Sequence, residues 1–271
     1  MGSTLLPIRE IREAVRAARP LIHCITNPIS IHQCANTVLA AGARPMMAEH
    51  PDEAAIITRS AGAVMLNLGN LTDVRMQSMR ISAQTAAEAG IPVLLDVCGA
   101  ACLPNRRSYA LSLMQAAAPA VVKGNYAEIM ALCRSDYRTD GVDDDGRCGV
   151  SQLDSAAAEL AKRCSTVIAA TGETDIVTDG KRLLHIRCGT PQLASVTGTG
   201  CMLGALTAAY LSASDAFAAA GAACAVFGIC GRLAETDRGS GTFAVQLMDA
   251  LSTVTEEQLS PFFGEITEVT L

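Results

Sequence analysis

The chain is poor in the residues on which nucleic-acid surfaces depend. It has no tryptophan, aromatic residues make up 3% of its 271 residues, and 21 Lys and Arg stand against 27 Asp and Glu. No basic tail or basic run occurs. Because nucleic-acid binding needs clustered positive charge and often aromatic stacking platforms, we expect no nucleic-acid partner.

Long apolar runs are also missing. The longest, "AFAAAGAACAVFGICG" (Ala216–Gly231), is too short for a hydrocarbon core of about 30 Å and is mostly alanine, glycine and cysteine. The first twenty residues carry arginines and glutamates among their apolar positions, unlike a signal peptide. We therefore expect Ala216–Gly231 to be a buried helix, and we expect no membrane partner.

The eleven cysteines include no C-x-x-C pair, and the nearest two are Cys98 and Cys102. Without an export signal, an odd number of cysteines favours reduced thiols and a cytoplasmic location. The acidic stretch Asp140–Gly149 resembles a calcium loop, but Gly141 and Gln152 stand at its first and twelfth positions. We interpret it as a surface loop.

Short, almost continuously apolar runs alternate with helical stretches. The runs lie at Leu21–Ile25, Ala63–Leu68, Pro92–Asp96, Ala120–Lys123 and Thr166–Ala170. Such runs are typical of strands covered on both faces, as in a parallel sheet. Helices are predicted at Ile31–Ala41, Asp73–Ala89, Arg106–Ala117, Tyr126–Leu132 and Gln152–Arg163. The fold class is therefore α/β, a doubly wound, mostly parallel sheet flanked by helices, in one domain over residues 1–271.

Three further features refine this prediction. Asp73 is a candidate cap for its helix, which Gly90 would end. The segment "TDIVTDGKRLLHIRCG" predicts a hairpin at Asp179-Gly180. From Thr199 onward the chain is expected to be wholly helical, apart from a break at "RGSGTF".

The sequence "SVTGTGCMLGALTAAYL" places a cysteine in the first turn of a helix after a glycine-rich loop. As a dinucleotide fingerprint the glycine spacing is one residue too long, and the loop comes too late in the chain. Cys201 could be a nucleophile, since a helix N-terminus favours a thiolate, given one of the four histidines as base. Alternatively the loop could be an anion hole for a phosphoryl group, or an ordinary turn.

Other strand ends support the anion hole. "KGNYAEIMAL" places Asn125 and Glu128 three residues apart after a strand, where they could hold Mg²⁺ directly or through water. Asp96 also ends a strand, and Thr171 begins a turn after another. In an open α/β sheet these strand ends share one crevice.

Taken together, these motifs resemble those of the hydroxyethylthiazole kinases, a thiamine-salvage family of the ribokinase-like superfamily. "HCITNPISIHQCANTVLAAGARPMMAEHP", "GNYAEIMAL", "GVD", "TGETDIVTDG", "GTGC" and "GSGTF" occur in the family order over nearly the whole chain. The resemblance implies ATP-dependent phosphorylation of the hydroxyl of 4-methyl-5-(2-hydroxyethyl)thiazole, with Mg²⁺ as cofactor. It also implies a homotrimer with active sites at the subunit interfaces.

The resemblance further implies roles for single residues. Cys201 matches the catalytic position at which most ribokinase-like kinases carry an aspartate, and would act as a mild base or position the hydroxyl. The remaining matches are Met47, Gly198 and Asn27 for substrate binding, Lys123, Thr171 and Gly200 for ATP, and Asp96 and Glu128 for Mg²⁺.

The chain departs from the family pattern at two places. Lys123 stands where arginine is usual, which keeps the charge but loses the bidentate fork. The segment after Asp96 reads "VCGAAC" rather than a pattern like "PVAVGA". The alternatives are a hydroxymethylpyrimidine or other small-alcohol kinase, a thiol-dependent hydrolase that uses Cys201, and a non-catalytic thiazole-binding protein.

Overall fold

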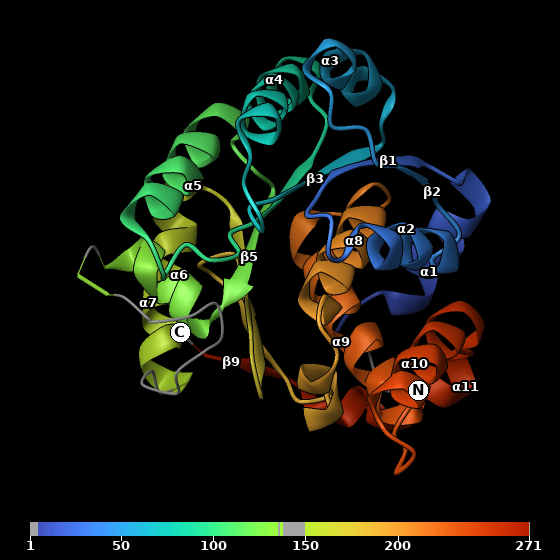
Figure 1. The fold of residues 1–271 in the computed structure, drawn as a ribbon. Coiled ribbons are helices and arrows are strands. Elements are labelled where there is room, and N and C mark those ends of the chain that lie inside the picture. The colour runs from blue at the N-terminus through green and yellow to red at the C-terminus, as the bar shows by residue number, and fades with distance from the viewer. Residues whose placement is uncertain (1–4, 135, 138–149, 271) are drawn as a thin grey trace.

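The middle layer of the protein is a twisted sheet with helices on both faces (Figure 1). The computed structural model describes residues 5–134, 136–137 and 150–270. Within them the strands are β1 Leu21–Ile25, β2 Arg44–Met46, β3 Ala63–Asn67, β4 Val93–Asp96, β5 Val121–Asn125, β6 Val167–Thr171, β7 Asp175–Thr178, β8 Leu183–Ile186 and β9 Ile266–Val269. Their order is β2-β1-β3-β4-β5-β6-β7-β8-β9, parallel from β2 to β6 and antiparallel beyond.

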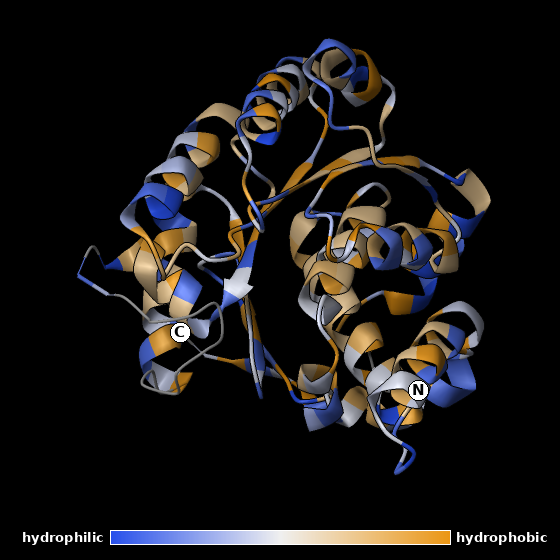
Figure 2. Ribbon diagram, in the orientation of Figure 1, coloured by the Kyte–Doolittle hydropathy of each residue, from blue (hydrophilic) through white to orange (hydrophobic). Residues whose placement is uncertain are grey.

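The helices divide between the two faces. They are α1 Ile8–Ala18, α2 Ile31–Ala40, α3 Pro51–Ser60, α4 Asp73–Ala89, α5 Pro104–Ala117, α6 Tyr126–Cys133, α7 Val150–Cys164, α8 Thr199–Leu211, α9 Ala216–Leu233, α10 Ser240–Thr253 and α11 Glu256–Leu259, with 3₁₀ turns η1 Pro191–Ser195 and η2 Ser260–Glu265. Helices α1, α2 and α8–α10 share one core with the sheet, and α4–α7 share the other, with α3 packed beside α4. Figure 2 shows the apolar strands between these two layers.

Successive strand residues face opposite layers, as the pleat requires. In β3, Met65 belongs to the core on the α8 side and Leu66 to the core on the α4 side. Leu94 and Leu95 in β4 divide in the same way. This double burial explains why the strands read as unbroken apolar runs.

The predicted pattern agrees with most of these elements. All five predicted strands and all five predicted helices are present, with ends that differ by two residues or fewer, and the hairpin at Asp179-Gly180 joins β7 to β8. Gly90 ends α4 in the left-handed conformation, with φ of 68°. The patterns gave no prediction for α1, β2 or α3.

Two expectations were wrong. The cap of α4 is Thr72, whose side chain accepts from the Arg75 amide, and Asp73 is the first helical residue. The chain after Thr199 is not wholly helical, because β9 pairs with β8. This edge strand is short and two of its four residues are exposed, so it lacks the apolar run that marks the inner strands.

Helix α9 has 18 residues and a mean hydropathy of 1.7, which is long and apolar enough to cross a membrane by composition alone. Yet 83% of it is buried inside the protein, packed between α8 and the strands β5–β8. It is therefore a core helix, as the sequence predicts. The acidic stretch Asp140–Gly149, which we interpret as a surface loop, and the "GVD" motif lie outside the described residues.

Candidate active site

Three polar side chains form a row across neighbouring strands at the carboxyl edge of the sheet. Asn67 pairs in register with Asp96, and Asp96 with Lys123, on β3, β4 and β5. Each lies two residues beyond an apolar residue of the core on the α8 side, so the row faces α8. All three are nearly inaccessible, with 0%, 2% and 4% exposure.

The first turns of α8 lie directly over this row. A Cβ at Gly204 would come within 2.8 Å of Met65 Cε and 3.4 Å of Asp96 Oδ2. A Cβ at Gly200 would lie 3.6 Å from Lys123 Nζ. The absence of a side chain at Gly204 therefore lets the helix approach the strands.

Cys201, the third residue of α8, meets the row through its sulfur. Asn67 Nδ2 and Asn27 Nδ2 each donate a hydrogen bond to Cys201 Sγ, and both donor–acceptor distances are 3.3 Å. The Ser30 side chain also lies beside this sulfur and acts to lower its pKa. Asn27 and Ser30 come from the segment between β1 and α2 and Asn67 from β3, so side chains from two separate parts of the chain converge on the thiol of α8.

Cys201 is 9% exposed, and its pKa is raised. Burial is the main cause and the charge of Asp96 adds to it, while the hydrogen bonds of Ser30 and Asn27 and the charge of Lys123 act in the opposite direction. The helix N-terminus alone therefore does not make this cysteine a thiolate.

None of the four histidines is hydrogen-bonded to Cys201. His23 bonds Thr58 and Ala48, His32 bonds Asn36, His50 caps α3, and His185 bonds Asp154. The geometry gives no support to a cysteine–histidine dyad.

Lys123 and Asp96 form a buried ion pair, with Nζ 3.1 Å from Oδ2 and side chains only 5% and 3% exposed. Burial acts to lower the pKa of Lys123, but the charges of Asp96, Cys201 and Glu128 together raise it above its ordinary value. Lys123 is therefore a permanent cation within the crevice.

Glu128 lies near this pair at the start of α6. Its Oε1 accepts from the Gly99 amide at 2.6 Å and its Oε2 from the Asn125 amide at 2.7 Å. The Asn125 side chain in turn accepts from the Glu128 amide, which completes a capping box. Burial and, next, the charge of Asp96 raise the pKa of Glu128 to about 7.

The other predicted residues come from three further segments. Gly198 precedes α8 with φ of 89°, and a Cβ there would lie 2.9 Å from Ser30 Cβ, so only glycine fits. Thr171 ends β6 and donates to the Gly124 carbonyl. Met47 follows β2, half-buried against the core on the α8 side; no polar contact ties it to Cys201.

Asn67 and Ser30 were not among the predicted site residues. A signal for Asn67 exists, because it is the one polar residue in the run "AVMLNL". A buried amide needs hydrogen-bond partners, so such a residue at a strand's carboxyl end is a candidate for a site.

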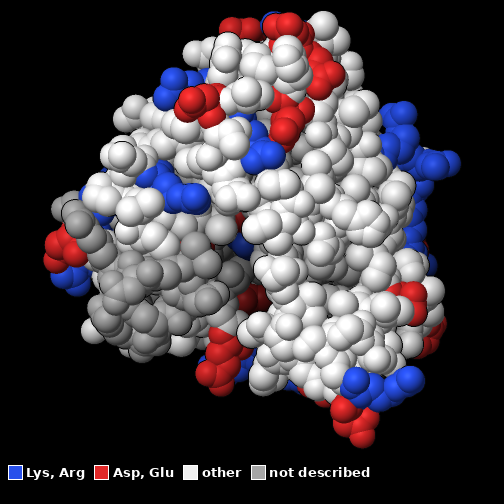
Figure 3. Space-filling view, in the orientation of Figure 1, with Lys and Arg blue, Asp and Glu red and all other residues white. Residues whose placement is uncertain are grey.

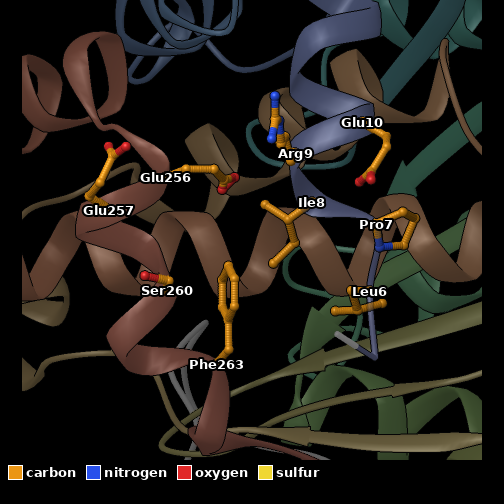
Figure 4. A pocket seen from close by; sticks show the side chains of 9 residues that line it. All are labelled: Leu6, Pro7, Ile8, Arg9, Glu10, Glu256, Glu257, Ser260 and Phe263. Carbon is orange, nitrogen blue, oxygen red and sulfur yellow. The ribbon is translucent and has the colours of Figure 1, made fainter. Parts of the chain in front are cut away.

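The face shown in Figure 3 is hollowed near its centre, with basic and acidic atoms inside the hollow. A separate pocket of about 540 Å³ lies between the start of α1 and the α11 segment (Figure 4). Apolar Leu6, Ile8 and Phe263 and acidic Glu256 and Glu257 line it, and none of the predicted site residues does.

Comparisons with known proteins agree with the sequence motifs. A profile of the Hydroxyethylthiazole kinase family matches residues 12–257. Hydroxyethylthiazole kinase 2 of Clostridium botulinum is 41% identical over 254 residues, which cover 92% of this chain and 96% of the relative. The hydroxyethylthiazole kinase of Methanoculleus marisnigri is 39% identical over 91% of this chain and 88% of its own length.

Solved structures give the same result. A hydroxyethylthiazole kinase from Pyrococcus horikoshii is 34% identical with a TM-score of 0.89, over 97% of this chain and 98% of that one. A ribokinase-like superfamily protein from Enterococcus faecalis, 14% identical with a TM-score of 0.65 over 94% and 96% of the two chains, shares the fold. The predicted ribokinase-like fold class is confirmed, and the chain belongs to the hydroxyethylthiazole kinase family.

Proposed function

We propose that the protein transfers the γ-phosphoryl group of ATP to the hydroxyl of 4-methyl-5-(2-hydroxyethyl)thiazole, a step of thiamine salvage. Family membership and the names of the relatives support the reaction class and the substrate. The observation that carries the proposal is the position of Cys201, at the N-terminus of α8 and beside Lys123 in one crevice.

The crevice suits a phosphoryl group. The first amides of α8 have no acceptor within the helix, so they can donate to phosphoryl oxygens, and the helix dipole favours negative charge there. Lys123 adds a fixed cation next to Gly200. We assign Lys123, Gly200 and Thr171 to the ATP side of the crevice.

On the acceptor side, the substrate hydroxyl oxygen forms the new bond to phosphorus as the bond from phosphorus to the ADP oxygen breaks. We assign Cys201 to hold that hydroxyl, with Gly198 and Met47 bordering the thiazole. The proton passes to the thiolate form of Cys201, which is the minor form because burial raises the pKa of the thiol. Because the transition state of phosphoryl transfer is loose, positioning the hydroxyl contributes more than removing its proton early.

The carboxylates fit a magnesium ion that is bound largely through phosphate and water. No cluster of three or more His, Cys, Asp or Glu able to hold a metal occurs among the described residues, so protein ligands alone would not suffice. Mg²⁺ typically uses one or two carboxylates plus substrate phosphates and water. Asp96 and Glu128 would supply them. Burial and, next, the charge of Asp96 raise the pKa of Glu128, and a cation bound near both carboxylates would offset these effects. The ion would neutralise charge on the transferred group.

We also propose a homotrimer with active sites at its interfaces and a cytoplasmic location. Ile29, Leu39 and Met46 are 60%, 56% and 39% exposed around α2 and the edge strand β2, next to Met47. Exposed apolar side chains on and beside an edge strand favour a protein interface. The ten described cysteines are free thiols, which fits a reducing compartment.

The first prediction concerns activity. In a coupled ADP-release assay with ATP and Mg²⁺, hydroxyethylthiazole should give turnover well above background, and removal of Mg²⁺ should abolish it. Hydroxymethylpyrimidine serves as the matched alcohol. Turnover with the pyrimidine but not with the thiazole would contradict the proposal and favour the alternative, a hydroxymethylpyrimidine kinase.

The second prediction concerns Cys201. Cys201→Ala should lower kcat by roughly 10²–10⁴, as for a lost general base, or by less if the thiol only positions the alcohol. Cys201→Asp should keep or raise activity, because a carboxylate is a competent base beside a helix N-terminus. The measurement is kcat at saturating Mg-ATP. An aspartate variant as inactive as the alanine variant, though folded and able to bind ATP, would contradict this role.

The third prediction concerns pH. Because the pKa of Glu128 rises from 4.5 to about 7 on folding, its protonated form stabilises the ligand-free protein, and this contribution is lost as pH rises from 4.5 through 7. Between these limits the stability of Glu128→Gln relative to the parent should improve by roughly 3 kcal/mol. Urea unfolding at several pH values measures this, and the exposed Glu159→Gln is the control. A relative stability independent of pH would be the contrary result.

The fourth prediction concerns assembly. Sedimentation should give about three times the 28.1 kDa chain mass. Leu39→Glu should shift the protein to monomer because it puts a charge into the proposed interface, whereas Ile56→Glu, on α3 and 70% exposed, should not. A monomeric parent protein at micromolar concentration would rule out the trimer.

A further inference from the structure

The amide groups around Cys201 have orientations that the backbone determines. Asn67 Oδ1 accepts from the Gly69 amide at 2.8 Å. Asn27 Oδ1 accepts from the amides of Ile29 and Ser30, each at 3.1 Å. Backbone amides can only donate, so both side-chain oxygens must face the backbone and both nitrogens must face the sulfur.

The two asparagines also support each other. Asn27 Nδ2 lies 3.4 Å from Asn67 Oδ1, and a Cβ at Gly69 would come within 2.9 Å of both side chains. Asn67 is completely buried and Asn27 is 6% exposed. The pair is therefore tightly confined.

The sulfur is consequently surrounded by donors. It accepts from two amide nitrogens, and the Ser30 hydroxyl, which also accepts from the Cys34 thiol at 3.8 Å, can donate to it as well. With these donors placed around it, the sulfur is open to a further partner only from the remaining side. An unclamped cysteine in the first turn of a helix would choose among rotamers.

We propose that Asn67, together with Asn27, is a positioning residue that clamps the Cys201 sulfur as a hydrogen-bond acceptor and fixes the direction from which the substrate hydroxyl meets it. The inference rests on the proposed phosphoryl transfer for the use of that direction. The clamp itself is a property of the ligand-free protein and can be tested without turnover.

Asn67→Asp is the sharpest variant. A carboxylate has nearly the same shape and can still accept from the Gly69 amide, but it cannot donate to sulfur and places negative charge beside it. Asn67→Ser is the second variant, because a serine hydroxyl can replace the turn-forming oxygen while being too short to reach the sulfur. Thr166→Val is the matched control, since it removes a buried hydrogen bond, to the Pro119 carbonyl, at the start of β6.

The first readout is the alkylation rate of Cys201 by iodoacetamide at one fixed pH, followed by mass spectrometry of its peptide. We expect Asn67→Asp to lower the rate about tenfold or more, as for a lost hydrogen bond to a charged group. Thr166→Val should leave it unchanged. An unchanged rate in folded Asn67→Asp and Asn67→Ser would overturn the clamp.

The second readout is a double-mutant cycle on turnover. Both Asn67 variants should lower kcat about tenfold or more and change the KM for ATP less than about twofold. In a Cys201→Ala background the same variants should change kcat by less than about twofold, because the group they position is gone. An equal loss in both backgrounds would show that Asn67 acts only structurally and would overturn the proposal. If the parent protein does not phosphorylate the thiazole, the proposed function fails and the alkylation rates alone decide this inference.

Discussion

The register of three parallel strands is the constraint on which the site depends. Because Asn67, Asp96 and Lys123 are neighbours in register, their side chains emerge on the same face of the sheet and meet the first turns of α8. A slip of one residue in β4 would turn Asp96 to the α4 side and leave Lys123 buried without its partner. Apolar burial on both faces fixes this register, so the same contacts that stabilise the fold align the site.

Charge is concentrated where water is scarce. Lys123 compensates Asp96 directly, whereas Glu128 relies on two backbone amides and keeps a pKa near neutrality. Buried ionised groups are costly unless they are paired. A crevice that retains such groups is suited to a ligand that brings charges of both signs, as a metal-bound phosphate does.

Much of the fold could be predicted from the sequence, because the inner strands are apolar throughout and helix ends such as Gly90 carry their own signal. β9 was not predicted, because an edge strand is partly exposed and does not need the apolar run by which the inner strands were recognised. Thr72 and Asp73 are both good caps, and sequence alone does not decide between adjacent candidates.

The site was predictable in part. Asp96, Lys123 and Cys201 follow from strand ends, a glycine loop and a family resemblance, and the structure brings them together. Asn67 was missed because its role depends on pairing across strands. The side chains of Asn125 and Glu128 each accept from the other's backbone amide in a capping box, an arrangement that was not predicted from the sequence, and the role of Glu128 at Mg²⁺ stays a prediction.

The central claim is that the Cys201 sulfur faces the acceptor hydroxyl within the crevice under α8. The most direct measurement is a crystal structure with hydroxyethylthiazole and a non-hydrolysable ATP analogue. Our account predicts the hydroxyl oxygen within about 3.5 Å of Cys201 Sγ, and the γ-phosphate at the first amides of α8. A thiazole bound away from Cys201, or a γ-phosphate out of reach of α8, would contradict it.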